Sequence, residues 1–237
     1  MLVWFTMEMT CPMCGSRLSG RELGSGFAIG QDSDLLVRMK NKHVIQAEIH
    51  TCQTCRYSGY VRDFSINTSP ELGGRFRREV TPQLVGGPRT SVSATPLPDV
   101  QYYWAYQSAA FLSRPPLKLG LLLLRAYWCL RITPSSRLPA REVHRRSKRY
   151  LHGCMANLRK SLRGSRNPHL YYLLGELTRR AGDFDLSRGY FDKFLAKSET
   201  ANYLRQAAAK LRAAAEEKDA RPRTMEELLY DHKTESS

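Results

Sequence analysis

The sequence predicts an α+β protein, with a small β module at the N-terminal end followed by a mainly helical domain. Four of the six cysteines, and the segments in which apolar and polar residues alternate, lie within residues 1–66. Five prolines interrupt residues 67–100, and from about residue 101 the apolar residues recur with the period of a helix. We therefore expect a β module over 1–66, a linker over 67–100, a helical domain over 101–220, and a short helix with a tail over 221–237.

Alternation of apolar and polar residues predicts the strands of the N-terminal module. Leu35–Lys40 and His43–His50 show this period-two pattern, which is typical of half-buried strands. The long gap between Cys14 and Cys52 fits a long β-hairpin or an inserted loop, and Arg21–Asp34 look like that loop. Residues 67–100 are rich in Pro, Gly and Ser and cannot bury enough apolar surface to offset their chain entropy, so we expect a linker or an extended cover.

The second half of the chain has helical periodicity. Arg114-Pro115-Pro116 separates the first two helices, because proline removes a backbone donor and restricts the residue before it. Asn167 and Pro168 are typical of a helix start, and Gly182 is typical of the break between two antiparallel helices. The predicted helices cover 101–112, 116–131, 141–162, a pair within 167–199, then 201–218 and 224–231.

Two Cys-x-x-Cys motifs predict a metal site in a zinc-ribbon-like module. Two such turns can place four thiolates tetrahedrally, which suits Zn²⁺ with bonds of about 2.3 Å. We predict a structural zinc site with Cys11, Cys14, Cys52 and Cys55 as its ligands. Iron would accept the same geometry. Arg56 follows the second motif, where a glycine would be easier, and His50 is either a competing ligand or an exposed strand histidine.

The same motifs argue against catalysis. A site with four thiolates has no open coordination position, whereas catalytic zinc keeps one for water or substrate. The sequence near the cysteines has no paired carboxylates, Ser-His-Asp order or His-x-Glu. We therefore expect no enzymatic activity. A thiol redox protein is the alternative, although no βαβ pattern surrounds either motif.

The chain has no membrane span or export signal in its sequence pattern. The apolar runs are shorter than the roughly 18–20 residues that cross a bilayer, and the N-terminal residues have neither the basic segment nor the cleavage site of a signal peptide. We expect a cytoplasmic protein, a compartment in which disulfides rarely persist. Cys129 and Cys154 are then small core residues.

The positive charge is concentrated in one segment. Of the formal net charge of +15, residues 101–165 supply most, because they contain 13 basic residues and one acidic residue. One basic segment suggests one binding face. The helix predicted over 141–162 has a basic face opposite its apolar stripe, which is either solvated or binds an acidic protein segment, with nucleic acid as the second choice. The basic residues are Arg141, Arg145, Lys148, Arg149, Arg159, Lys160 and Arg163.

The helical pair resembles a tetratricopeptide (TPR) unit. In YYLLGELTRRAGDFDLSRGYFDKFL, Tyr171, Leu174 and Gly175 match the large, Leu and Gly positions of the first helix, and Phe191 matches the aromatic of the second. The chain departs from the pattern at Thr178, Ser187, Phe194 and Glu199. The resemblance implies a groove that holds a peptide or a helix without chemistry of its own. One clear repeat is present where about three are needed, so flanking helices would complete the array.

The order of motifs also resembles a family of uncharacterised bacterial proteins, catalogued as a domain of unknown function (number two-two-two-five). The matching motifs are CPxCG, a hairpin, D-L-x-x-R, TCxxCxYSG-x-x-x-DF and YYLLGEL-x-RR-x-GDFD-x-x-x-x-YF. The resemblance implies that the four cysteines are metal ligands, and it supplies no activity. We predict a non-enzymatic adaptor or scaffold that binds a protein partner through the TPR-like domain. The alternative is a nucleic-acid-binding regulator that uses the zinc ribbon and the basic helix 141–163.

Overall fold

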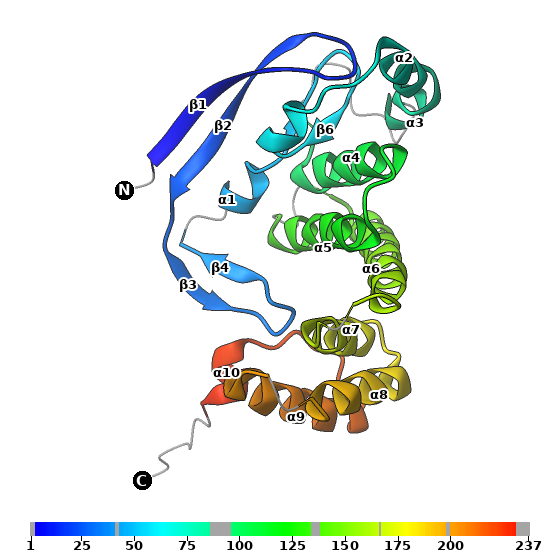
Figure 1. Ribbon diagram of the computed structural model, residues 1–237. Helices are drawn as coiled ribbons and strands as arrows, with labels where there is room; N and C mark the ends of the chain where they lie inside the picture. Colours follow the sequence, from blue (N-terminus) through cyan, green and yellow to red (C-terminus); the bar gives the residue numbers. More distant parts are fainter. Residues whose placement is uncertain are drawn as a thin grey trace. The chain divides into compact units, whose positions relative to one another are not determined.

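The computed structural model describes residues 3–40, 43–85, 96–133, 138–165, 167–197 and 200–230. Short antiparallel strand pairs come first and helices follow, which confirms the predicted α+β class (Figure 1). The chain forms two compact units. The first unit comprises Met1–Gly26 and Asn41–Cys154, and the second comprises Phe27–Lys40 and Met155–Ser237. In the part of the chain that is described, no helix is both long and apolar enough to cross a membrane.

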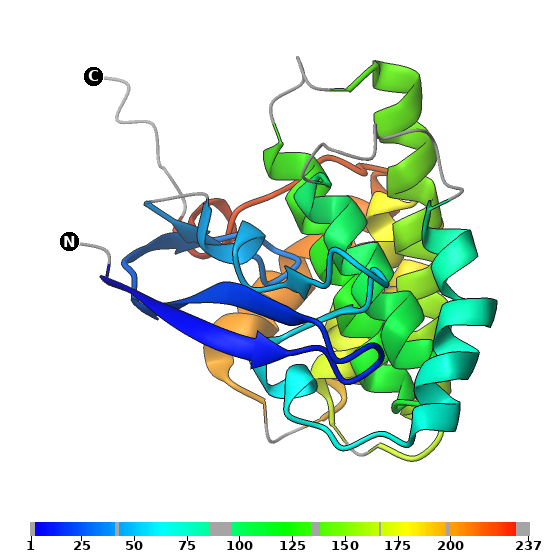
Figure 2. The same ribbon diagram turned by 90° about the horizontal axis from the view of Figure 1, so that it is seen from above.

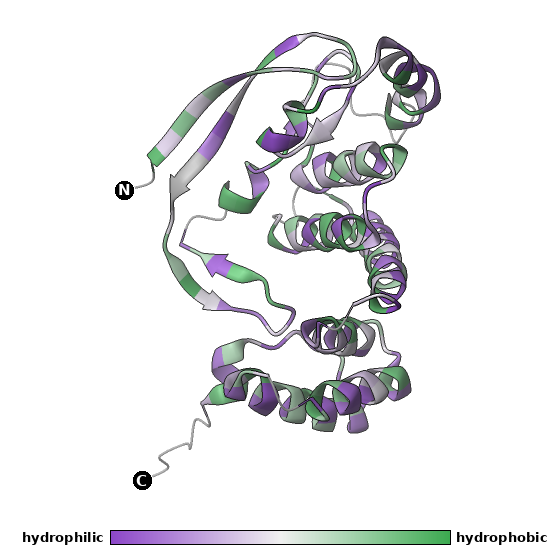
Figure 3. Cartoon of the chain, viewed as in Figure 1, coloured by the Kyte–Doolittle hydropathy of each residue, from purple (hydrophilic) through white to green (hydrophobic). Residues whose placement is uncertain are grey.

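Two β-hairpins in the first unit carry the cysteine motifs in their turns. β1 (Val3–Thr10) pairs with β2 (Arg17–Ser25), and β5 (His50–Thr51) pairs with β6 (Ser58–Gly59). Apolar and hydrophilic residues alternate along β1 (Figure 3), but Met9 is the one residue of this strand that is buried. Each turn between paired strands therefore presents two cysteines.

The strand predicted over His43–His50 is wrong in its first part. The structure has a helical turn, α1 (His43–Gln46), and only His50 joins strand β5. The Ile45 carbonyl accepts a hydrogen bond of 2.9 Å from the Tyr102 hydroxyl. This contact comes from a distant part of the chain, and it illustrates why alternation alone does not decide the conformation of a short segment.

The loop predicted over Arg21–Asp34 is mostly strand. β2 continues to Ser25, and β3 (Ala28–Gln31) then pairs antiparallel with β4 (Val37–Met39). The β3–β4 hairpin belongs to the second unit, although its residues lie between the two cysteine motifs in the sequence. The strand predicted within Leu35–Lys40 is confirmed by β4.

The linker predicted over 67–100 contains two helices, α2 (Pro70–Glu79) and α3 (Thr81–Val85). The Ser69 side chain caps α2 by accepting a hydrogen bond from the Leu72 amide. Phe76, Val80 and Leu84 are spaced by four residues and are buried in the same core as the cysteines. This apolar stripe offsets the chain entropy that the composition of the segment suggests is too costly. Residues 86–95 of the predicted linker lie outside the described residues.

The three predicted helices that follow are confirmed as α4 (Pro98–Phe111), α5 (Pro116–Ile132) and α6 (Ala140–Leu162). α4 and α5 lie side by side in both views of the molecule (Figures 1 and 2). Most of the apolar stripe predicted for this helix is buried in α6, and Cys154 is one of the buried residues. The buried members of the stripe are Tyr150, Leu151, Cys154, Met155 and Leu158.

The second unit contains the predicted helical pair, α7 (His169–Arg180) and α8 (Phe184–Leu195), followed by α9 (Asn202–Glu216) and α10 (Met225–Leu229). Gly182, in the turn of the pair, has φ of +83°, the left-handed conformation that glycine adopts without cost. A Cβ on Gly175 would lie 2.9 Å from the Phe191 ring, so glycine at this position permits the close approach of α8. The assignment of this pair to the TPR class stays a prediction.

Candidate metal centre

The four cysteines of the two motifs lie together. Their sulfur atoms are all within 4.8 Å of one another, with 3.5 Å between Cys11 and Cys55 and 3.5 Å between Cys14 and Cys52. A tetrahedral site with metal–sulfur bonds of about 2.3 Å needs sulfur–sulfur separations of about 3.8 Å. The observed range includes this value, and all four cysteines are free of disulfide bonds. The four thiols therefore fit the ligand set of a metal centre.

The two cysteine turns share one backbone geometry. The Gly15 amide donates a hydrogen bond of 2.8 Å to the Cys11 carbonyl, and the Arg56 amide donates one of 2.9 Å to the Cys52 carbonyl. Both donors have left-handed backbones, with φ of +73° for Gly15 and +63° for Arg56. Glycine tolerates this conformation freely, whereas another residue pays about 1–2 kcal/mol. The second turn therefore holds an arginine at a position that favours glycine.

Two contacts offset the backbone strain at Arg56. Its guanidinium donates a hydrogen bond of 2.7 Å to the Gln53 side chain. The same guanidinium lies 5.7 Å from the centre of the Trp104 ring, a cation–π contact that contributes about 0.5–1 kcal/mol. The second cysteine turn is thereby connected to α4, on which Trp104 lies.

The protonation chemistry of the cluster suits a cation. The hydrogen bond with Cys52 is the largest of the effects that raise the pKa of Cys11 to about 12, and the same bond lowers the pKa of Cys52 far below its ordinary value. Hydrogen bonding to Cys11 also raises the pKa of Cys55 well above its ordinary value. Thiolates this close repel one another, and a divalent cation among them removes that repulsion and deprotonates coordinating thiols.

Helix α2 and its flanking residues hold both cysteine turns. A Cβ on Gly73 would lie 2.6 Å from the Met13 carbonyl, so α2 touches the backbone of the first turn. The Thr68 hydroxyl donates to the Pro12 carbonyl in the same turn. On the second turn, the Thr81 hydroxyl donates a hydrogen bond of 2.8 Å to the Cys55 carbonyl. The segment predicted as a linker is therefore part of the framework that holds the cysteine cluster.

His50 is not part of the cysteine cluster. Among the described residues, the side chains grouped closely enough to hold an ion are the four cysteines. His50 instead lines a cavity of about 570 Å³ in the first unit. Burial lowers its pKa, and the nearby Glu22 carboxylate opposes that effect.

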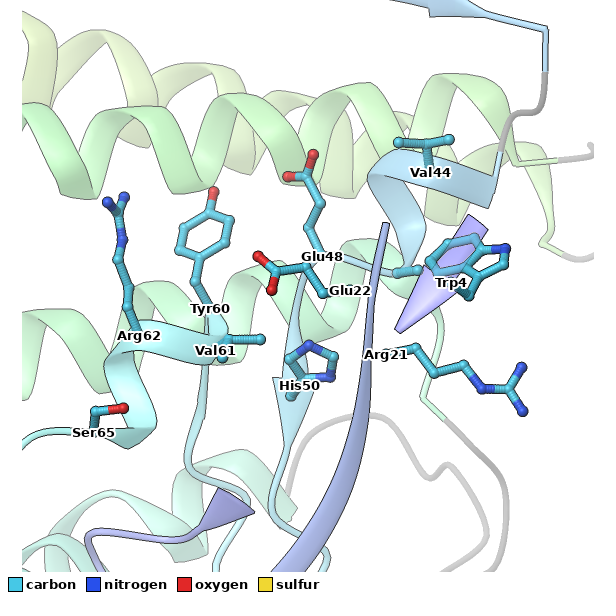
Figure 4. A pocket seen from close by; sticks show the side chains of 11 residues that line it. Trp4, Arg21, Glu22, Val44, Glu48, His50, Tyr60, Val61, Arg62 and Ser65 are labelled. Atoms are coloured by element: carbon cyan, nitrogen blue, oxygen red, sulfur yellow. The ribbon is translucent and has the colours of Figure 1, made fainter. Parts of the chain in front are cut away.

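The cavity beside His50 has mixed charge. Glu22 and Glu48 both line it, and in Figure 4 the Arg21 side chain points away from these two carboxylates. Glu48 already accepts hydrogen bonds from Arg125 and, at 3.0 Å, from the Tyr102 hydroxyl. One of the two carboxylates is therefore neutralised within the fold.

The seven basic residues singled out from the sequence are all exposed, and they are divided between the two units. Arg141, Arg145, Lys148 and Arg149 belong to the first unit, and Arg159, Lys160 and Arg163 belong to the second. Of the seven, Arg145 and Arg149 line a cavity of about 250 Å³ between α3, α4 and α6. That these residues bind a partner stays a prediction.

Carboxylates engage two of the arginines at this cavity. Arg145 donates two hydrogen bonds of 2.8 and 2.7 Å to Glu142, and these bonds are the main cause that lowers the pKa of Glu142 to about 2. Arg146 is buried and contacts both Glu142, at 2.7 Å, and Asp99, at 3.0 Å. The Arg149 guanidinium lies 5.7 Å from the centre of the Tyr103 ring, and no described carboxylate pairs with it.

Arg146 is not among the basic residues predicted from the sequence to bind a partner. Its spacing of four residues from Glu142 on one helix is a sequence signal for an ion pair. The contact with Asp99 has no such signal, because the two residues are separated by 47 positions.

A buried ionic network in the second unit explains two of the motifs that support the family resemblance. Arg179 is fully buried and donates bonds of 2.8 and 2.9 Å to Glu176. Arg180 bonds to Glu176 at 2.6 Å and to Asp34 at 3.0 Å, while the Ser33 hydroxyl donates to Glu176 at 2.6 Å. Asp34 begins the D-L-x-x-R motif on the β3–β4 hairpin, and the other charges belong to the α7 motif. These residues hold the hairpin to α7 and have a structural role.

Comparison with known proteins shows a family to which most of the chain matches. The family described as "Uncharacterized protein conserved in bacteria (DUF2225)" matches residues 4–225, which include both cysteine motifs and the α7–α8 pair. No curated protein and no solved structure matches the chain. Because the family match covers nearly the whole chain, the protein belongs to this family of uncharacterised proteins conserved in bacteria.

Proposed function

We propose that the protein is a non-enzymatic adaptor of the cytoplasm that carries a structural zinc ion and binds an acidic segment of a partner protein. The zinc ion would hold the two cysteine turns together. The binding surface would be the cavity between α3, α4 and α6, next to the second turn.

The donor set supports zinc in a structural role. Four cysteine thiolates are soft ligands that favour zinc or iron over magnesium or calcium. A complete set of four protein ligands leaves no position for water or substrate, which is the arrangement of structural zinc sites. The absence of disulfide bonds among the cysteines suits a reducing compartment.

The binding proposal depends on one observation, namely that Arg149 is exposed and has no carboxylate neighbour among the described residues. This arginine is exposed, lines a cavity and has an aromatic ring rather than a carboxylate as its described neighbour. Around the cavity, three arginines share two carboxylates, so one positive charge is left for an external anion. Charge complementarity favours an acidic segment.

A binding assay tests the proposal. A fluorescein-labelled peptide of alternating Glu and Gly is titrated with the metal-loaded protein, and fluorescence anisotropy is followed. Reversal of charge at both Arg145 and Arg149 should weaken binding at least about tenfold, which corresponds to roughly 1.4 kcal/mol. Failure of the unaltered protein to bind the peptide at low salt would refute the proposal.

The same assay separates the nucleic-acid alternative. A labelled single-stranded oligonucleotide replaces the peptide, and the salt concentration is varied. Each neutralised phosphate of a single strand adds about −0.7 to the slope of log affinity against log salt. Tighter binding of the oligonucleotide than of the peptide, with a steep slope, would favour the regulator over the adaptor.

A further inference from the structure

We infer that the cavity between α3, α4 and α6 is an anchor site for one aromatic side chain of the acidic partner segment, with flanking carboxylates held by Arg145 and Arg149. This inference rests on the proposed function and adds the identity of the anchoring residue. The evidence for it is that the buried residues lining the cavity are apolar, aromatic or already paired in charge, whereas two of the exposed ones are arginines.

The size of the cavity suits one side chain. Its volume is about 250 Å³, which is below the roughly 300–1,000 Å³ of pockets that enclose drug-sized ligands. Residues from three helices line it, so its walls are part of the fold: Leu84 from α3, Trp104 from α4 and Tyr150 from α6 are all buried. A partner would therefore insert a single residue rather than lay an extended surface on it.

The buried end of the cavity is already neutral. The Arg146 guanidinium bonds to Asp99 at 3.0 Å and to Glu142 at 2.7 Å, and the Tyr150 hydroxyl donates to Asp99 at 2.9 Å. The Asp99 carboxylate is fully buried and lies between these two donors. An anion that entered this deep part would lose its hydration without gaining a free cation, so the inserted group should be uncharged.

The walls favour an aromatic group. The Tyr103 ring lies 5.9 Å from that of Tyr150, and the Trp104 indole carries the Arg56 guanidinium 5.7 Å from its centre. Tyr103, Trp104 and Tyr150 all line the cavity. Aromatic rings pack against one another in offset or edge-to-face arrangements that add to the free energy of their burial. A ring inserted here would join an existing cluster of rings.

The exposed end of the cavity supplies the charge. Arg149 has no carboxylate partner among the described residues, and the Arg145 side chain is 49% exposed while it shares Glu142 with Arg146. Carboxylates on either side of an inserted ring would meet these guanidinium groups at the mouth. The cavity thus has a buried end without net charge, aromatic walls and arginines at its opening. These features match an aromatic residue that is flanked by acidic residues.

Two peptides and three variants of the metal-loaded full chain test this inference by fluorescence anisotropy. One fluorescein-labelled peptide places a single Phe within a run of Glu and Asp, and the second replaces that Phe with Ala. Burial of the ring should make the Phe peptide bind roughly 10- to 100-fold more tightly than the Ala peptide.

The variants separate the ring from the charge. Gln83 is exposed and lines the cavity, so Gln83→Trp fills the space without changing any charge. This variant should bind both peptides with the affinity that the unaltered protein has for the Ala peptide. Arg149→Glu should weaken the binding of both peptides at least about tenfold. Arg77→Glu is the matched control, because it makes the same change at an exposed arginine of the first unit that does not line the cavity.

Each result decides between the claims. A preference for the Phe peptide that Gln83→Trp removes supports the anchor site, provided that circular dichroism shows the variant to be folded. Equal binding of both peptides, or a preference that Gln83→Trp leaves intact, overturns the anchor site and leaves the proposed function standing. If neither peptide binds, the proposed function and the anchor site are both overturned.

Discussion

The two adjacent glycines of α2 offer a test of how the metal centre is held. A Cβ on Gly73 would lie 2.6 Å from the Met13 carbonyl oxygen, whereas a Cβ on Gly74 would meet only the end of the Arg78 side chain, at 3.5 Å. Alanine in place of glycine in a helix interior gains about 0.5–1 kcal/mol. At Gly73 this gain is opposed by overpacking, which costs about 1–3 kcal/mol. The obstructing atom belongs to the backbone between Cys11 and Cys14, so it cannot rotate away as a side chain would.

We therefore expect Gly73→Ala to be less stable than Gly74→Ala by about 1–3 kcal/mol. Urea denaturation of the two metal-loaded variants, followed by circular dichroism, measures this difference. Gly73→Ala should also release its metal faster to a chelator, because the first cysteine turn must shift to admit the methyl group. Equal stability and equal metal release in the two variants would refute the claim that α2 supports the turn.

Three further predictions concern charged residues. Arg179→Met should lower the free energy of unfolding by about 3–5 kcal/mol, because it removes a buried hydrogen-bond partner from Glu176 and from two backbone carbonyls. Arg188→Met breaks an exposed ion pair of the same spacing and should cost less than about 1 kcal/mol. Equal losses of stability in urea denaturation would contradict the role of burial. Arg56→Ala keeps the left-handed strain and loses the Trp104 contact, so it should be less stable than Arg56→Gly by about 1 kcal/mol, and the reverse order would be inconsistent with strain at this turn. Arg145 lowers the pKa of Glu142 to about 2, so the stabilisation by this ion pair is complete above the unfolded-state pKa of about 4.3 and is lost as the pH falls toward 2. The stability difference between the unaltered protein and Glu142→Gln should therefore shrink between pH 6 and pH 3.5. A difference that grows over this range would show that the ion pair is absent.

Local patterns were sufficient for most of the helices. Periodicity, Pro115-Pro116 and Gly182 are signals within a few residues of the helix ends that they mark, and the structure confirms those helices. Helices α2 and α3 were missed because the number of prolines outweighed a weaker signal. Ser69-Pro70 is a typical helix start, and the Phe76 ring packs against Tyr57 and Phe111 at 5.7 and 5.3 Å. Those two contacts come from segments that a local pattern cannot connect.

The cysteine cluster was predictable because the ligand type and the Cys-x-x-Cys spacing are both encoded locally. The charge pattern was less informative. Counting basic residues indicated a continuous basic face, yet Asp99 lies just outside the counted segment and neutralises Arg146. Pairing over 47 residues depends on how α4 and α6 pack, and a single sequence contains no signal for it. The narrower site around Arg149 follows only from the structure.

Metal content tests the central claim most directly. The purified full-length chain is analysed for zinc and iron by mass spectrometry of the elements, and its reactive thiols are titrated before and after addition of a chelator. The cluster of Cys11, Cys14, Cys52 and Cys55 predicts close to one zinc ion per chain, with four thiols that react only as the metal is removed. A metal content far below one ion per chain, together with four thiols that react freely from the start, would contradict the account.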